Sequence, residues 1–473
     1  MWRLVVMVGC GVAFIEQPYT RSETVRVTPK DNVAALVTAA PPGTSFLFAP
    51  GLYLTQINPK DGDSFTGQGK VVLTGAQPLA FTAAGGVWTA AIGANPRGSA
   101  RCAAGHPLCD QRRDLYVDNV PLAPVNTAGE LSAKGWYFDA VSGTATLNFD
   151  PAGHNVEIST LKWAFANTGA DVSLSHLIVE KYASPPQFGA VGAQGAANPA
   201  GDGARGWHVS DTEVRLSHGT GIQLSDGSSM VRCFVHHNGQ KGVGARGPHI
   251  LLQDSEISWN NFAGYDYGWE AGGSKFSRTT DLQVLNNSVH DNAGGGLWAD
   301  IDNQNALFRL NKVEHNAGTG IQYEISYGAL IEQNTVRENG SAPRVSLWQA
   351  QISIQNSSGV TVRENTVVVP KDSGNGIVVI NQERGIGDLG ARLGVGNTVT
   401  GNTVTYLGTG GASGLMDPLG TATNNRFDTN TYIFQIGGEH FESRGKKTWE
   451  QYRALGNDPS SRILDLTKGG AAK

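Results

Sequence analysis

A repeating asparagine pattern is the feature of this chain that most constrains its fold. The pattern Asn-x-Val-x-x-Asn occurs at 287–292, 311–316 and 334–339, each time followed by a glycine-led apolar segment. Weaker copies begin at Cys233, Ser255, Asn365 and Asn402. The first positions 233, 255, 287, 311 and 334 give steps of 22, 32, 24 and 23 residues. A period of this size, with Val/Ile alternation and Gly/Asn corners, predicts a parallel β-helix.

The asparagine columns are interpreted as structural. Asparagine tolerates the left-handed backbone conformation that turns require, and its amide can bond to the neighbouring coil. The rival repeat architecture is the leucine-rich repeat, but the leucine spacing and the helical segments that it needs are missing.

The period divides the chain into segments. We expect a leader at 1–24, an N-terminal cap with the first coils at 25–84, and a β insertion at 85–160, where the period breaks. The β-helix core follows at 161–440, and a C-terminal cap and tail at 441–473. Helical caps are expected at both ends because bare coil ends would expose strand edges and core.

The overall charge and the termini narrow the class of protein. The net charge of −5 and the pI near 6.1 argue against a nucleic-acid partner, because no basic stripe is present to neutralise phosphates. Apolar runs beyond the N-terminus are too short for a membrane span. The stretch 1–15 has one arginine followed by an apolar run of about signal-peptide length, which favours export.

Two of the four cysteines lie close together. Cys102 and Cys109 flank a short Gly/Pro loop, and in an oxidising compartment they are candidates for a disulfide. The spacing fits no familiar zinc pattern, although His106 lies between them. Cys233 occupies a repeat position and is expected to be a small core residue.

The coils, the opening segment 43–53 and the tail 449–458 resemble bacterial right-handed parallel β-helix proteins of the pectin-lyase-like superfamily. The resemblance covers nearly the whole chain after about residue 25 and is closest to the β-helical glycoside hydrolases. It implies an all-β, right-handed, single-stranded solenoid with a small β insertion and helical end caps. It also implies a secreted or cell-envelope protein that acts on a polysaccharide without an organic cofactor, and we expect a monomer. The signature motifs of polygalacturonases and alginate epimerases are absent.

Acidic residues recur at matching offsets in three glycine-led segments, 264–270, 296–302 and 320–326. Aligned on their glycines, Asp300 falls on Glu324 and Glu270 falls on Asp302. If the segments are neighbouring strands, about 4.7–4.9 Å apart, the carboxyl groups crowd one exposed face. Because crowded like charges are costly, this predicts a catalytic site.

Glycoside hydrolysis needs one carboxylic acid and one carboxylate. We therefore predict Asp300 as nucleophile and Glu324 as general acid and base, with a spacing that favours retention. Asp302 and Glu270 are the rival catalytic pair or, more simply, substrate-binding acids. The other predicted substrate-binding residues are Trp298, Trp269, Lys275, Arg246, Gln322 and Tyr327.

Two other functions remain open. In a Ca²⁺-dependent polysaccharide lyase or uronate epimerase, Lys275 or Arg246 would act on a uronate and the acids would bind Ca²⁺. In a non-catalytic carbohydrate-binding or adhesion β-helix, the acids would bind only Ca²⁺ or sugar. The predicted register makes this face net negative, which disfavours an anionic substrate and favours the hydrolase, for which no metal is required.

Overall fold

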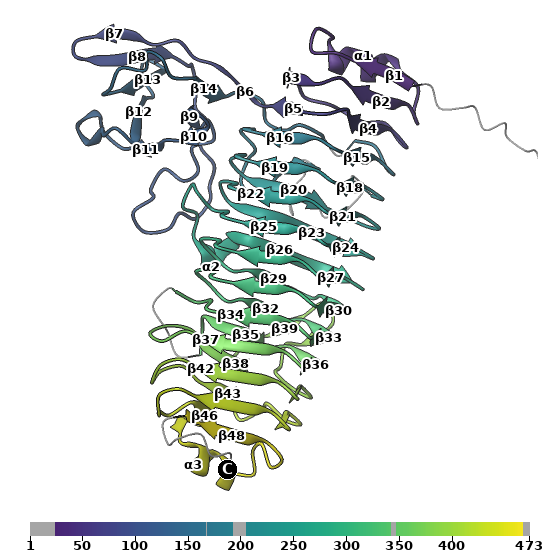
Figure 1. Cartoon of the computed structure of the whole chain (residues 1–473), viewed down its shortest axis with the longest axis vertical. Coiled ribbons are helices and arrows are strands. Elements are labelled where there is room, and N and C mark those ends of the chain that lie inside the picture. Colours follow the sequence, from purple (N-terminus) through teal and green to yellow (C-terminus); the bar gives the residue numbers. More distant parts are fainter. Residues whose placement is uncertain (1–23, 167, 193–204, 342–346, 467–473) are drawn as a thin grey trace, which may run out of the picture.

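The computed structural model describes residues 24–166, 168–192, 205–341 and 347–466. The predicted leader at 1–24 therefore lies almost wholly outside the described residues. Within them the chain forms an elongated stack of coils, most of which contribute three short parallel strands that pair with the equivalent strands of the next coil (Figure 1). In the described residues no helix is long and apolar enough to cross a membrane.

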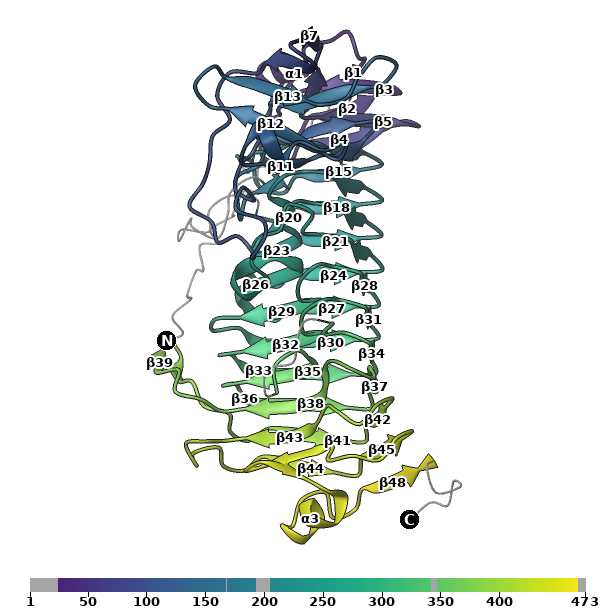
Figure 2. The ribbon, with the colours of Figure 1, turned by 90° about the vertical axis from the view of Figure 1, so that its left-hand side faces the viewer.

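Three columns of strands form the three sides of the stack (Figure 2). The first column contains β17 (Gly189–Val191), β20 (Thr220–Leu224), β23 (Lys241–Pro248), β26 (Gly272–Thr280), β29 (Leu297–Asp300), β32 (Ile321–Glu324), β35 (Ala350–Gln355), β38 (Asn375–Ile380), β43 (Ser413–Met416) and β46 (Phe441–Ser443).

The second column contains β1 (Thr24–Val27), β2 (Ser45–Phe48), β4 (Ser64–Gly67), β15 (Ser173–Ser175), β18 (His208–Ser210), β21 (Ser229–Val231), β24 (Leu251–Gln253), β27 (Gln283–Leu285), β30 (Gln304–Arg309), β33 (Tyr327–Glu332), β36 (Ser358–Arg363), β41 (Thr398–Thr400) and β44 (Arg426–Asp428). The third contains β3 (Gly51–Leu54), β5 (Val71–Thr74), β16 (Ile178–Glu180), β19 (Glu213–Arg215), β22 (Phe234–His236), β25 (Glu256–Ser258), β28 (Ser288–His290), β31 (Lys312–Glu314), β34 (Thr335–Arg337), β37 (Thr366–Val369), β42 (Thr403–Tyr406), β45 (Thr431–Phe434) and β48 (Arg462–Asp465).

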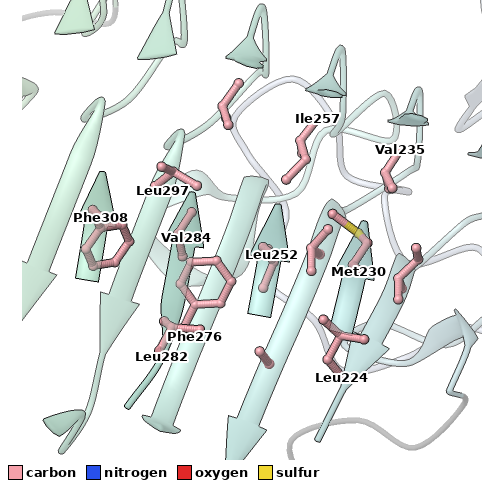
Figure 3. Close-up of a cluster of buried hydrophobic side chains, with 14 of the residues drawn as sticks. Leu224, Met230, Val235, Leu252, Ile257, Phe276, Leu282, Val284, Leu297 and Phe308 are labelled. Carbon is pink, nitrogen blue, oxygen red and sulfur yellow. The ribbon is translucent and has the colours of Figure 1, made fainter. Parts of the chain in front are cut away.

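The core runs through the centre of the stack because inward side chains repeat from coil to coil. In the third column Val235, Ile257, Val289 and Val313 are paired in register, and all four are fully buried. Figure 3 shows such residues from all three columns, among them Phe276 and Phe308, meeting inside the coils. Removing this apolar surface from water at about 25 cal/mol per Å² drives the stacking.

Two ladders of buried asparagines run along the turns. Asn287, Asn311, Asn334, Asn365, Asn402 and Asn430 form one ladder, and Asn238, Asn260, Asn292, Asn316 and Asn339 form the other. Each side-chain oxygen accepts bonds from the amide and the backbone N–H of the previous asparagine, as between Asn316 and Asn292. The predicted inter-coil bonding is confirmed, but the predicted left-handed conformation is wrong for these residues. It falls instead on the residue before each asparagine, such as Asp291 and His315.

Both ends of the stack carry a short helix, as predicted. At the N-terminal end, α1 (Val33–Ala39) buries Val33 and Val37, and its N-cap Asn32 accepts a bond from Ala35. At the other end, α3 (Trp449–Ala454) begins with a capping box between Thr448 and Gln451. Near α3, β47 (Lys446–Lys447) pairs antiparallel with β46.

A small β unit projects beside the first coils (Figure 1). One of its sheets contains β6 (Ala76–Pro78), β9 (Leu115–Val117), β10 (Val120–Pro121) and β14 (Val156–Ser159). The other contains β7 (Thr82–Ala84), β8 (Val87–Ala91), β11 (Ala123–Val125), β12 (Gly135–Asp139) and β13 (Thr144–Leu147), and a 3₁₀ turn spans Ala128–Glu130. The unit has its own core around Leu115, Trp136 and Ile158. We call it the inserted unit.

Among the described residues, two of the segments that interrupt the coils along the first column contain helices or strands of their own. The first contains the short helix α2 (Tyr267–Glu270), between β25 and β26. The second contains a small hairpin of β39 (Ile386–Gly387) and β40 (Gly390–Ala391), after β38. Both lie beside the strands that carry the predicted acids.

Candidate active site

The floor of the candidate site is formed by β26, β29 and β32. Asp300 and Glu324 are register partners on β29 and β32. Both residues are buried, with 6% and 5% of their surface exposed. Glycines lead these strands because the turn has no room for a side chain: a Cβ at Gly296 would lie 2.6 Å from the carbonyl oxygen of Gly320. The pairing of Asp300 with Glu324 confirms their predicted register.

The two oxygens of Asp300 have different surroundings. Its Oδ2 lies 2.9 Å from the Nζ of Lys275, which comes from β26. Its Oδ1 is buried and has no hydrogen-bond partner among the described residues. Lys275 thus holds one oxygen of the carboxylate, while the other has no protein partner among the described residues.

Glu324 accepts bonds at both oxygens. Arg384 donates to Oε1 at 2.7 Å, and Trp298 and Gln322 donate to Oε2 at 3.1 and 2.8 Å. The pKa of Glu324 is nevertheless raised, first because burial penalises its charged form and second because the negative Asp300 lies beside it. The cations of Arg384 and Lys275 oppose this rise.

Lys275 belongs to a buried chain of alternating charges. Its Nζ lies 3.6 Å from Glu270 Oε1, and Glu270 Oε2 lies 2.5 Å from the Nζ of Lys241. Burial is the largest influence on Glu270 and would raise its pKa, but Lys241 and Lys275 together lower it. The ammonium of Lys275 also lies 4.1 Å from the ring centroid of Trp298, within cation–π range.

A pocket of about 340 Å³ opens above Asp300 and Glu324. Its floor also includes Lys275, Trp298 and Gln322. Its walls come from the segments between the strands: Tyr267 and Gly268 from α2, Trp348 and Gln349 from the turn before β35, and Arg384 from the loop after β38. Lined by two carboxyl groups, two cations and aromatic rings, it suits a polar ligand with several hydroxyl groups.

Comparison with known proteins supports the handedness of the coils. Residues 200–367 match the family model described as right handed beta helix region. The fold is a right-handed parallel β-helix.

Solved β-helix structures superpose along nearly the whole chain. The complex of XylC with xylose has a TM-score of 0.69 at 13% identity and covers 91% of this chain and 82% of XylC. The A-module of the mannuronan C-5 epimerase AlgE4 of Azotobacter vinelandii has a TM-score of 0.51 at 11% identity, covering 87% of this chain and 94% of the module. At such low identities, these superpositions show a shared fold alone. No sequence among the curated proteins matches the chain.

Six of the eight predicted binding residues line the pocket or contact residues next to it. Trp298, Lys275 and Gln322 line the pocket, and Glu270 lies behind Lys275. Asp302 and Tyr327 lie beside the pocket and anchor the loop that carries Arg384: Asp302 pairs with Arg392 at 3.2 Å, and the hydroxyl of Tyr327 donates to Gly390.

Trp269 and Arg246 are not among the residues that line the pocket. The ring of Trp269 packs in an apolar cluster with Tyr265 and the cysteines, while its carbonyl oxygen accepts a bond from Lys275. Arg246 lies further along β23, where burial and then the neighbouring Arg278 lower its pKa.

The predicted strand at 264–270 is wrong. These residues form a loop and α2, and the strand of this coil is β26, in which Phe276 pairs with Ala299. Glu270 therefore does not align with Asp302. The mistake has a local cause, since the residues between β25 and β26 include a glycine of their own, Gly264.

The predicted net negative charge of this face is also wrong. Glu270, Asp300 and Glu324 are balanced by Lys241, Lys275 and Arg384. The sequence did not predict Arg384, Tyr267, Trp348 or Gln349 as site residues, because they come from segments between the strands, outside the repeat. Lys241 is also absent from the predicted set, although it is the first residue of β23. Among the described residues, no group of three or more His, Cys, Asp or Glu side chains is arranged to hold a metal ion.

Proposed function

We propose that this chain is a glycoside hydrolase that cleaves a cell-wall or extracellular polysaccharide by a retaining, two-carboxylate mechanism. The observation that carries the proposal is the pairing of Asp300 with Glu324 in contrasting environments. Asp300 is held by Lys275 through one oxygen, and its other oxygen has no partner among the described residues. Glu324 has a raised pKa. Carboxyl groups whose environments separate their pKa values in this way suit a nucleophile and a general acid.

In this mechanism, Oδ1 of Asp300 attacks the anomeric carbon while Glu324 gives its proton to the departing glycosidic oxygen. A covalent glycosyl–Asp300 ester forms, and the leaving sugar departs with the proton. Glu324 then takes a proton from water, which attacks the ester and releases Asp300 as a carboxylate. Lys275 stays bonded to Oδ2 throughout and stabilises the charge that returns to Asp300.

The spacing of the strands favours retention over inversion. Register partners on neighbouring strands lie about 4.8 Å apart, close to the roughly 5–5.5 Å between carboxyl groups in retaining enzymes. Inverting enzymes need about 6.5–9.5 Å to admit a water molecule.

The similarity to XylC, solved with xylose, agrees with a sugar in the pocket. We further propose that the protein is exported and acts as a monomer. The disulfide between Cys102 and Cys109 is consistent with an oxidising compartment. The mechanism needs no metal or organic cofactor.

A polysaccharide lyase or epimerase is the second candidate, because Lys275 lines the pocket and the AlgE4 module shares the fold. The position of Lys275 argues against it. Its ammonium donates towards Asp300 and Glu270, whereas a catalytic base must accept the proton of the sugar carbon.

A polysaccharide panel tests the proposal. Wild type, Asp300→Asn and Glu324→Gln would be assayed for reducing ends and for the ultraviolet absorbance of unsaturated sugars. Glu332→Gln is the matched control, since Glu332 is also a buried carboxylate but lies between Arg309 and Arg363, outside the pocket. We expect reducing ends from wild type and from the control, and a loss of at least about 10³-fold in both catalytic variants.

The other outcomes would contradict the hydrolase. Ultraviolet-absorbing product that is lost in Lys275→Ala or on chelation would identify a lyase. Sugar binding without any product would identify a binding protein. Nuclear magnetic resonance of the first anomer released would separate retention from inversion.

A further inference from the structure

The inserted unit reaches the wall of the candidate site through its disulfide loop. Cys102, which is bonded to Cys109, pairs with Tyr265 as an isolated antiparallel bridge. The backbone N–H of Ala103 donates to Gly264 at 2.9 Å, and that of Asp266 donates to Arg101 at 3.0 Å. The segment that leads into α2 is therefore paired, as a strand would be, with a loop more than 150 residues earlier in the chain.

Side chains lock this contact from both sides. Tyr265 is fully buried, and its hydroxyl lies 2.8 Å from Nε2 of His218. The other ring nitrogen of His218, Nδ1, lies 3.1 Å from the carboxylate of Asp114 in the inserted unit. Gly264 has a φ of +79°, in the left-handed region, and a Cβ there would lie 2.2 Å from the ring of His106. The backbone at Gly264 thus fits closely beneath the disulfide loop.

The segment continues directly into the charge chain behind Asp300. Asp266 caps α2 by accepting a bond from Gly268, and α2 ends at Glu270. Glu270 is buried between Lys241 and Lys275, and Lys275 holds Oδ2 of Asp300. A continuous set of contacts therefore links the inserted unit to the nucleophile of the proposed mechanism.

We propose that Glu270 and Lys241 are positioning residues, held in place by the disulfide loop of the inserted unit, that fix Lys275 against Asp300. The inference rests on the proposed function. A lysine has a long, flexible side chain, and one carboxylate would leave it several ways to reach Asp300. A second carboxylate, itself held by Lys241, restricts Lys275 to one position. Small errors in the position of a reacting group can reduce a rate by about 10²-fold.

The test measures kcat and KM separately in Glu270→Gln and Lys241→Met. We expect kcat to fall roughly 10- to 100-fold with KM changed by less than about threefold, because neither residue is expected to contact the sugar. Glu332→Gln is the matched control: Glu332 is equally buried and lies between Arg309 and Arg363 on neighbouring coils, away from the pocket. It should lose stability but keep kcat.

A second measurement does not depend on activity. Hydrogen exchange of residues 264–276 would be compared in the oxidised wild type, in the protein reduced with a phosphine, and in Cys102→Ser/Cys109→Ser. We expect faster exchange through 264–270 and into the start of β26 after loss of the disulfide, while β36 and β37 keep their protection.

The two measurements separate this inference from the proposed function. Wild-type kcat in Glu270→Gln and Lys241→Met, in an enzyme that Asp300→Asn inactivates, would overturn the positioning role. Unchanged exchange at 272–276 without the disulfide would overturn the link to the inserted unit. If Asp300→Asn left activity intact, the hydrolase proposal would fail, and the exchange result would still decide whether the contact reaches β26.

Discussion

At the scale of single residues, the two carboxyl groups of the candidate site lie side by side but differ in the side chains that bond to them. Asp300 and Glu324 are equally buried register partners, yet one faces a lysine and the other an arginine, an indole and an amide. The pKa of Glu324 is raised because burial and Asp300 outweigh the opposing effect of Arg384 and Lys275. A single substitution among these neighbours should therefore shift the pKa of Glu324.

Arg384→Met should move the basic limb of the pH–rate profile to higher pH. Arg384 lowers the pKa of Glu324, so its removal raises that pKa, and a general acid stays protonated up to a higher pH. The measurement is kcat/KM against pH in wild type and variant. Arg426→Met is the control, because Arg426 is an exposed arginine paired with Asp428 at another coil. A basic limb that stays in place or moves to lower pH would show that Glu324 is not the acid.

At the scale of elements, the asparagine ladders set the register on which the site depends. Each ladder asparagine bonds to the backbone and side chain of its neighbour, so that successive coils cannot slide past one another. The second ladder lies in the turn just before the first column, only a few residues from Gly296 and Gly320. The register of Asp300 with Glu324 follows from these bonds.

Asn316→Ala should destabilise the protein markedly. It removes the acceptor of the buried N–H of Asn292 and the donor to Val289, and each buried polar group left unsatisfied costs about 1–3 kcal/mol. Urea denaturation would measure the loss. Gln283→Ala, an exposed position on β27, should change the free energy of unfolding by less than about 0.5 kcal/mol. Equal stabilities of the two variants would contradict a structural role for the ladder.

The sequence predicts the elements where the repeat is regular and fails where it is interrupted. Asp300 and Glu324 were placed correctly because each follows a strand-leading glycine by four residues. Glu270 follows Gly264 by six residues, as Asp302 follows Gly296, but Gly264 belongs to an added loop that pairs with the distant disulfide loop. Arg384 could not be placed at all, since its loop has no period and is anchored by Asp302 and Tyr327.

At the scale of the whole molecule, the ends of the stack are the vulnerable regions. A coil without a neighbour exposes apolar residues and unpaired strand edges, which favour association with other chains. At the C-terminal end, α3 covers the last coils: Tyr452 is buried and its ring stacks on Phe441, with centroids 4.7 Å apart. The helix α3 therefore shields the apolar side chains of the last coils from solvent and from other chains.

Tyr452→Asp should release α3 and promote association. A charged group cannot stay in this apolar position without a partner, so the helix would detach and expose the last coil. Light scattering after size-exclusion chromatography would detect the oligomers. Leu455→Asp is the control, because Leu455 is in the same segment but 59% exposed. A monomeric Tyr452→Asp variant that melts like the wild type would show that the cap is dispensable.

The division between a regular floor and irregular walls has an evolutionary consequence. The floor of the candidate site is fixed by coil-to-coil register, whereas the residues above it come from segments that interrupt the coils without entering the core. Those segments can lengthen, shorten or be replaced while the carboxyl pair stays in position. If the proposed function is correct, changes in these segments would alter which sugars the pocket accepts before they altered the reaction.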